Sequence, residues 1–151
     1  MRIIDSIKSI LFEQTRSYRG LISVLQRERE CLINLDAEKV ENLSKEKATI
    51  LLRLRLLEEE RIRLIKKYSA DNGNAGSVSL QSLSDLTADN DFQLVRSQLT
   101  SLLQSIQELN DFNMILIERS LSAVRNSVGF LESFGLHINQ NNTGAVLSKE
   151  I

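Results

Sequence analysis

The sequence predicts an all-α protein, a long antiparallel helical hairpin or coiled coil with a short middle helix and a flexible C-terminal tail. Two observations support this fold class: apolar residues recur every three or four positions over most of the chain, and the 151 residues include no proline. Because proline is the strongest helix breaker, its absence leaves long helices unopposed. A chain of this length fits one domain, which we place at residues 1–135, followed by the tail at 136–151.

The first predicted helix covers residues 2–68. Its apolar positions form a heptad seam that runs from Ile4 to Leu32 and resumes, in a different phase, at Val40. Two consecutive steps of four residues, with Asp36 in the middle, cause this change of phase, which is a stutter. An acidic residue therefore stands where the seam is expected to be apolar.

Whether this helix is continuous depends on residues 34–36. After Gly20 the segment contains no glycine or proline, so we expect a single helix of about 65 residues, near 100 Å at 1.5 Å per residue. The alternative is a break at this place, with the side chain of Asp36 capping the first turn of a second helix.

Two further helices are predicted after a polar loop. The loop, "SADNGNAGS" at residues 69–77, contains Asn-Gly and small residues that readily adopt left-handed conformations. A short helix is predicted at 79–87 and a second long one at 91–134, where Gly135 supplies a stop. The remaining residues, 136–151, lack periodicity and are rich in asparagine, which is typical of a disordered tail.

The two long helices differ in predicted length, about 100 Å against about 66 Å. In an antiparallel hairpin the shorter helix would end opposite about residue 25, and the apolar N-terminus would have no cover within the chain. We therefore predict a second interaction surface there, formed by Ile4, Ile7, Leu11 and Phe12. The alternatives are that the long helix folds back on itself, or that two chains dimerise through it as a homo-oligomer.

Charge and hydropathy argue against binding to nucleic acid and against insertion into a membrane. The formal net charge is −1, and the basic residues of the first helix are interleaved with glutamates rather than gathered on one stripe. No segment approaches the roughly 20 apolar residues of a membrane span, and the N-terminus lacks the apolar core of a signal peptide. The single cysteine, Cys31, rules out an intrachain disulfide and fits a reducing compartment. We expect a soluble, cytoplasmic protein.

No group of residues suggests an active site, and we expect no enzymatic activity, no metal and no cofactor. The single histidine, His137, lies in the predicted tail, and Cys31 has no histidine near it in sequence. The three glutamates at 58–60 point in different directions around a helix, and pairing with the arginines that follow explains them as a solvated face.

Two asparagines in the last helix are more informative. Asn110 and Asn113 are three residues apart, so they share a helix face whose other members are apolar. A buried asparagine in a helical seam fixes register and partner number at some cost in stability. The alternative is that these amides form hydrogen bonds with a bound helix.

Two segments resemble the FlgN family of flagellar export chaperones. The segment "LDAEKVENLSKEKATILLRLRLLEEER", residues 35–61, is similar to the family's N-terminal signature of a Leu-Asp start, a spaced Leu, a Glu-Lys pair and Leu repeats that end in acidic residues and arginine. The segment "QELNDFNMILIERSL", residues 107–121, is similar to the pattern LxxLNxxNxxLI of the family's last helix. The resemblance covers about residues 5–134, including a short middle helix.

The resemblance implies a non-enzymatic, cytoplasmic bacterial chaperone of flagellar type III export. Its partners would be the helical C-terminal segments of hook-associated (hook–filament junction) proteins, which it keeps from premature assembly and delivers to the gate of the flagellar export apparatus. We expect the cargo to bind the last helix, completing a bundle by helix-in-groove packing. The expected cargo-binding residues are Leu109, Asn110, Asn113, Leu116, Ile117, Leu121, Val124, Val128 and Leu131. The alternative is a structural coiled-coil protein that oligomerises through surplus apolar surface and has no dedicated cargo.

Overall fold

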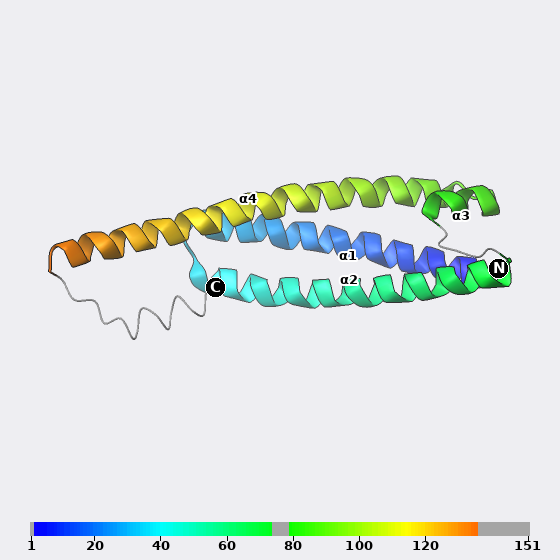
Figure 1. Cartoon of the computed structure of the whole chain (residues 1–151), viewed down its shortest axis with the longest axis horizontal. Coiled ribbons are helices and arrows are strands. Elements are labelled where there is room, and N and C mark those ends of the chain that lie inside the picture. Colours follow the sequence, from blue (N-terminus) through cyan, green and yellow to red (C-terminus); the bar gives the residue numbers. More distant parts are fainter. Residues whose placement is uncertain (1, 74–78, 136–151) are drawn as a thin grey trace.

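The computed structural model describes residues 2–73 and 79–135, which form an elongated bundle of helices (Figure 1). The elements are α1 (Arg2–Ile33), α2 (Ala37–Asp71), α3 (Leu80–Thr87) and α4 (Asp91–Ser133). The described residues contain no β-strand. The all-α class and the short middle helix are therefore confirmed.

The prediction of one continuous helix over residues 2–68 is wrong, because the chain reverses direction midway. Leu35 adopts a left-handed φ of 55°. The N–H of Leu35 donates to the carbonyl of Leu32 at 3.3 Å, and the N–H of Asp36 donates to the carbonyl of Cys31 at 3.0 Å. This pair of bonds is a Schellman motif, which ends a helix by satisfying its last carbonyl groups.

The second helix of the reversal begins at the residue that interrupts the apolar seam. The side chain of Asp36 accepts a hydrogen bond from the N–H of Lys39 at 3.2 Å and so caps α2. The alternative prediction, a break with Asp36 as the N-cap, is thus correct. The stutter in the seam marks a turn between two helices and not an irregularity within one.

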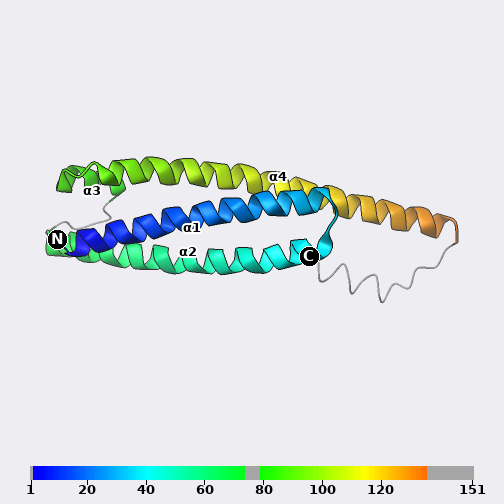
Figure 2. The same ribbon diagram turned by 180° about the vertical axis from the view of Figure 1, so that it is seen from behind.

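The central helix of the bundle is α1. The antiparallel partner is α2, whereas α4 runs parallel to α1, since Lys8 lies beside Asp91 and Leu25 lies beside Asn113 (Figures 1 and 2). Within the described residues, α2 and α4 each pack along α1 but scarcely contact each other. The predicted antiparallel hairpin exists, but α1 and α2 form it within the segment that was expected to be a single helix.

Two clusters of apolar side chains hold the helices together. The N-terminal cluster joins all four helices and consists of Ile7, Leu11, Leu64, Ile65, Leu83 and Phe92. The central cluster consists of Leu21, Leu25 and Leu54, with Ile106 and Leu109 of α4 packed against it. Residues 74–78, and the predicted tail at 136–151 with His137, lie outside the described residues.

The prediction that the apolar N-terminus lacks cover within the chain is wrong. Ile7 and Leu11 are fully buried in the N-terminal cluster, and Ile4 is half-buried against it. The cover comes from the end of α2, from α3 and from the start of α4, because the first segment folds back on itself. Of the four residues expected to form a second interaction surface, Phe12 is the one that is well exposed, at 66%.

Candidate partner-binding surface

A buried polar layer joins α1, α2 and α4 near the C-terminal end of α1. We define the polar layer as Glu28 of α1, Lys47 of α2 and Asn113 of α4. The Nδ2 of Asn113 donates to Glu28 Oε1 at 2.9 Å and to the backbone carbonyl of Leu25 at 2.9 Å. Lys47 Nζ donates to Glu28 Oε2 at 2.8 Å. Glu28 and Asn113 are almost completely buried, so these contacts replace lost hydration.

The polar layer supports one of the two interpretations of the asparagine pair. Asn113 is buried and is bonded to α1 of its own chain, which supports the register-fixing role, whereas Asn110 is exposed. Asn113 Oδ1 has no hydrogen-bond partner among the described residues. A shift of α4 by one residue would remove both bonds of Asn113 and leave Glu28 without its amide donor. The layer therefore fixes the axial position of α4 on α1.

The fixed register leaves the last part of α4 beyond the end of α1. Asn113 lies level with Leu25 and Glu28, and α1 continues for about five residues more, to Ile33. Because the two helices are parallel, α1 ends near residue 119 of α4. The remaining segment, about 14 residues or 21 Å, projects past the α1–α2 turn (Figures 1 and 2). We call residues 120–133 of α4 the overhang.

The overhang carries an apolar stripe that continues the seam of α4. Its members are spaced by three or four residues and are Leu121, Val124, Val128 and Leu131. Val124 and Leu131 are 42% and 38% exposed, and the other two are half-buried. Along the covered part of α4, the corresponding positions pack on α1. We call these four residues the overhang stripe.

Eight of the nine residues expected to bind cargo fall into two groups. Leu109 and Asn113 contact α1, and Leu116 and Ile117 are half-buried near the end of α1, so these four lie along the part of α4 that runs beside α1. The overhang stripe supplies four more. Asn110 belongs to neither group, since it is exposed beside the covered seam.

Other exposed apolar residues near the overhang were not anticipated from the sequence. Phe130 and Phe134 are 63% and 68% exposed, and their rings meet edge to face with centroids 4.8 Å apart. Ile33 and Leu35 at the α1–α2 turn are 60% and 77% exposed. The i,i+4 spacing of the two phenylalanines was a usable signal. The exposure of Ile33 and Leu35 had no such signal in the sequence, because it depends on where the chain reverses direction.

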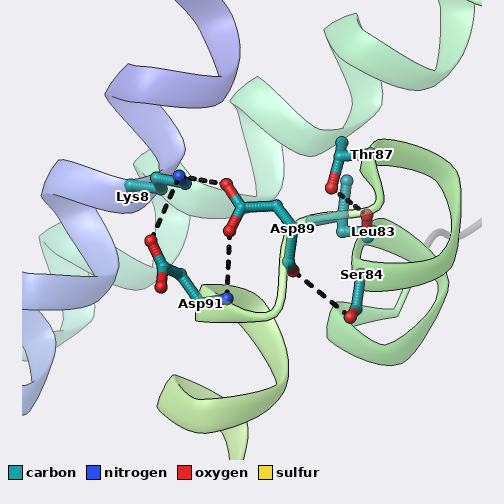
Figure 3. A network of polar contacts seen from close by, with 6 residues as sticks. All are labelled: Lys8, Leu83, Ser84, Thr87, Asp89 and Asp91. Atoms are coloured by element: carbon teal, nitrogen blue, oxygen red, sulfur yellow. Dashed lines mark hydrogen bonds and ion pairs between the residues drawn. The ribbon is translucent and has the colours of Figure 1, made fainter.

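At the opposite end of the bundle, a cluster of charged side chains joins α1 to the start of α4. Lys8 of α1 pairs with Asp89, in the joint between α3 and α4, and lies 3.4 Å from Asp91 (Figure 3). Its Nζ also lies 5.7 Å from the centre of the Phe92 ring. The hydrogen bond from Lys8 is the main cause that lowers the pKa of Asp89, and the N–H of Asp91 adds to it. Among the described ion pairs, these two join α1 to the segment formed by the α3–α4 joint and the start of α4.

We expect the Lys8→Met variant to raise the pKa of the Asp89 carboxyl toward its ordinary value, since its main hydrogen-bond donor is lost. A carboxyl with a lowered pKa stabilises the fold above its unfolded pKa, and the stabilisation is lost as the pH falls through the folded value. The wild-type and methionine proteins should therefore converge in stability once the pH falls below the lowered pKa of Asp89. NMR titration of the carboxyl measures the shift, and an unchanged pKa would contradict the pairing.

The described residues hold no arrangement that points to catalysis. No group of three His, Cys, Asp or Glu side chains in residues 2–73 and 79–135 is placed to bind a metal ion. The carboxylate of Glu58 pairs with Arg61 and accepts a hydrogen bond from Gln14 at 2.8 Å, and the first of these contacts is the main cause that lowers its pKa. None of the described helices is both long and apolar enough to cross a membrane.

The family model of the FlgN protein matches residues 1–141, which is nearly the whole chain. The chain belongs to the FlgN family. No curated protein and no solved structure matches it significantly. Membership implies the general role of a flagellar export chaperone, and FlgN proteins are chaperones rather than enzymes. The resemblance seen in the two sequence segments is thereby confirmed.

Proposed function

We propose that this FlgN protein is a cytoplasmic chaperone of bacterial flagellar type III export that binds the helical C-terminal segment of hook-associated proteins. It keeps these proteins unassembled and delivers them to the export gate. The overhang is the proposed cargo site. The observation that supports this assignment is an apolar helix face that extends past the end of α1 and that the described residues leave partly exposed.

The overhang fits a helix better than it fits an extended peptide. No described strand offers an edge for β-pairing, whereas the overhang stripe repeats at the spacing that receives an amphipathic helix. Two charges of each sign lie on α4 from residue 118 onward, so the site selects its ligand by apolar contact more than by net charge. A cargo helix with leucine or isoleucine on one face would extend the packing that α1 provides over the rest of α4.

The test compares two aspartate substitutions on α4. Val124→Asp places a charge within the overhang stripe, whereas Ile115→Asp is the matched control. Ile115 is 46% exposed, close to the 42% of Val124, but lies two residues after Asn113, about 200° around the helix from the seam. We expect Val124→Asp to weaken binding of a hook-associated protein at least tenfold, equivalent to about 1.4 kcal/mol, and Ile115→Asp to leave it unchanged. Calorimetric titration measures both affinities.

A second comparison tests the identity of the cargo segment. The wild-type chaperone should retain the intact hook-associated protein and lose it when its C-terminal segment is deleted. Equal binding with and without that segment would contradict the proposal. The contrary outcome is that the free protein forms a stable oligomer whose size does not change when cargo is added and which Val124→Asp dissociates. That outcome would mean that the structural coiled-coil alternative is correct. Light scattering at micromolar concentration distinguishes these results.

A further inference from the structure

We propose that the α1–α2 turn forms one end of the cargo site, with Ile33 and Leu35 as apolar contacts for the end of the bound helix. This inference rests on the proposed function and adds to it a position for the ligand. The bound helix lies on the overhang in line with α1, in the place that α1 would take if it were longer. Its first or last turn then rests against the α1–α2 turn.

Leu35 combines two unfavourable features in one residue. It holds a left-handed φ of 55° at the position of a Schellman motif where glycine is usual. Its side chain is nevertheless 77% exposed, so it gains little from burial within its own chain. A leucine that costs conformational energy and also exposes an apolar side chain is explained if a ligand covers it.

Ile33 ends α1, five residues after Glu28, whose carboxylate bonds to Asn113 of α4. Ile33 is 60% exposed, whereas Leu25 and Glu28 before it are buried. The described residues therefore leave the last turn of α1 partly uncovered at the start of the overhang.

The overhang stripe continues the apolar face of α4 that packs on α1, and this indicates that the ligand is a helix. The same face of α4 packs on α1 up to about Ile117 and continues beyond the end of α1 to Leu131. The vacant length, about 14 residues or 21 Å, accepts roughly four turns of an amphipathic helix. Such a helix would meet the overhang stripe along its side and the exposed pair Ile33 and Leu35 at its end. A partner helix with one apolar face is thus the ligand that fits both surfaces.

Substitutions at Leu35 separate this role from a structural one. Leu35→Gly relieves the left-handed strain, so the melting temperature should rise by about 3 °C, while the affinity for cargo falls about tenfold. Leu35→Asn tolerates the same φ without adding flexibility and should also weaken binding. The matched control is Ala88→Gly, because Ala88 has a φ of 54° at the far end of the bundle. It should raise the melting temperature and leave affinity unchanged.

The probe is the isolated C-terminal helical segment of a hook-associated protein, titrated by calorimetry into each full-length variant. Weaker binding by both Leu35 variants, with stability kept or raised, supports the proposal. Wild-type affinity in both variants would overturn it, even if Val124→Asp abolishes binding and so upholds the overhang as the cargo site. If neither Leu35 nor Val124 affects affinity, the proposed function fails as well. A wild-type dimer that Leu35→Asn dissociates would assign the turn to a second copy and overturn the partner-helix proposal.

Discussion

Replacing Phe92 with alanine is expected to lower the free energy of unfolding by about 3–5 kcal/mol. The ring is fully buried in the N-terminal cluster, which also contains side chains from α1, α2 and α3. A cavity left there cannot close easily, because the ion pairs of Lys8 hold the start of α4 beside α1. Domains typically have only about 5–15 kcal/mol of stability, so this single change removes a large part of it.

Urea denaturation followed by far-UV circular dichroism measures this loss. Phe12→Ala is the matched control, since it removes the same side chain from a position that is 66% exposed. Its effect should stay within about 0.5 kcal/mol. Equal losses for the two alanine variants would mean that the N-terminal cluster does not have the packing described, and would favour the exposed N-terminal surface that the sequence predicted.

The seam positions could be predicted from the sequence, including most of the polar ones. The three-or-four-residue repeat places one set of positions of the second half of the first segment in the seam, and all of them are buried or half-buried: Val40, Leu43, Lys47, Ile50, Leu54, Leu57, Arg61, Leu64 and Tyr68. The same holds for the repeat in the last helix: Phe92, Val95, Leu99, Leu102, Ile106, Leu109, Asn113 and Leu116. Periodicity succeeds here because burial along a helix follows its 3.6-residue repeat, whatever the partner helix is. The polar residues Glu28, Lys47 and Asn113 interrupted this pattern separately. They form one layer only when three helices come together, which no local pattern encodes.

The reversal at Leu35 was beyond the reach of the same reasoning. Turns are recognised by glycine, proline or Asn-Gly, and a leucine in the left-handed region provides none of these signals. The stutter and the capping aspartate were visible, but both also fit an irregular continuous helix. The choice between them depends on packing: folding back lets α2 cover the buried residues of α1, and this gain exceeds the cost of the turn.

The position of the free surface followed from that one choice. A continuous helix paired with a shorter one would expose the N-terminus, whereas the folded-back hairpin exposes the end of α4 instead. The overhang stripe was named among the expected cargo residues because its periodicity continued, not because its exposure was foreseen. The turn residues Ile33 and Leu35 could not be named, since their exposure exists only after the chain reverses.

Replacing Asn113 with aspartate is expected to cost about 3–5 kcal/mol at neutral pH. The change preserves side-chain shape but removes the amide donor, and it places a second carboxylate within contact of Glu28 Oε1 and the carbonyl of Leu25, each now 2.9 Å from the amide nitrogen. Lys47 already pairs with Glu28 and cannot neutralise both acids. The buried site therefore gains a charge without a partner.

The penalty should diminish as the pH is lowered. Burial and the neighbouring carboxylate raise the pKa of the introduced carboxyl in the fold. The folded state then binds a proton that the unfolded chain still lacks, so stability recovers as the pH falls from that raised value toward about 4. The protonated acid can donate a hydrogen bond to Glu28 or to Leu25. Asn110→Asp, three residues earlier and exposed, should change stability by less than about 0.5 kcal/mol at any of these pH values.

Hydrogen exchange would show where the Asn113→Asp variant opens. The polar layer is the last buried contact before the overhang, whereas the N-terminal cluster lies at the other end of α4 and is untouched by the change. Amides after about residue 106 should therefore lose protection before those near Phe92 do. Uniform loss along α4 would mean that the helix is released as one unit. In that case the polar layer would not be the contact that fixes the axial position of α4 on α1, and with it the length of the overhang.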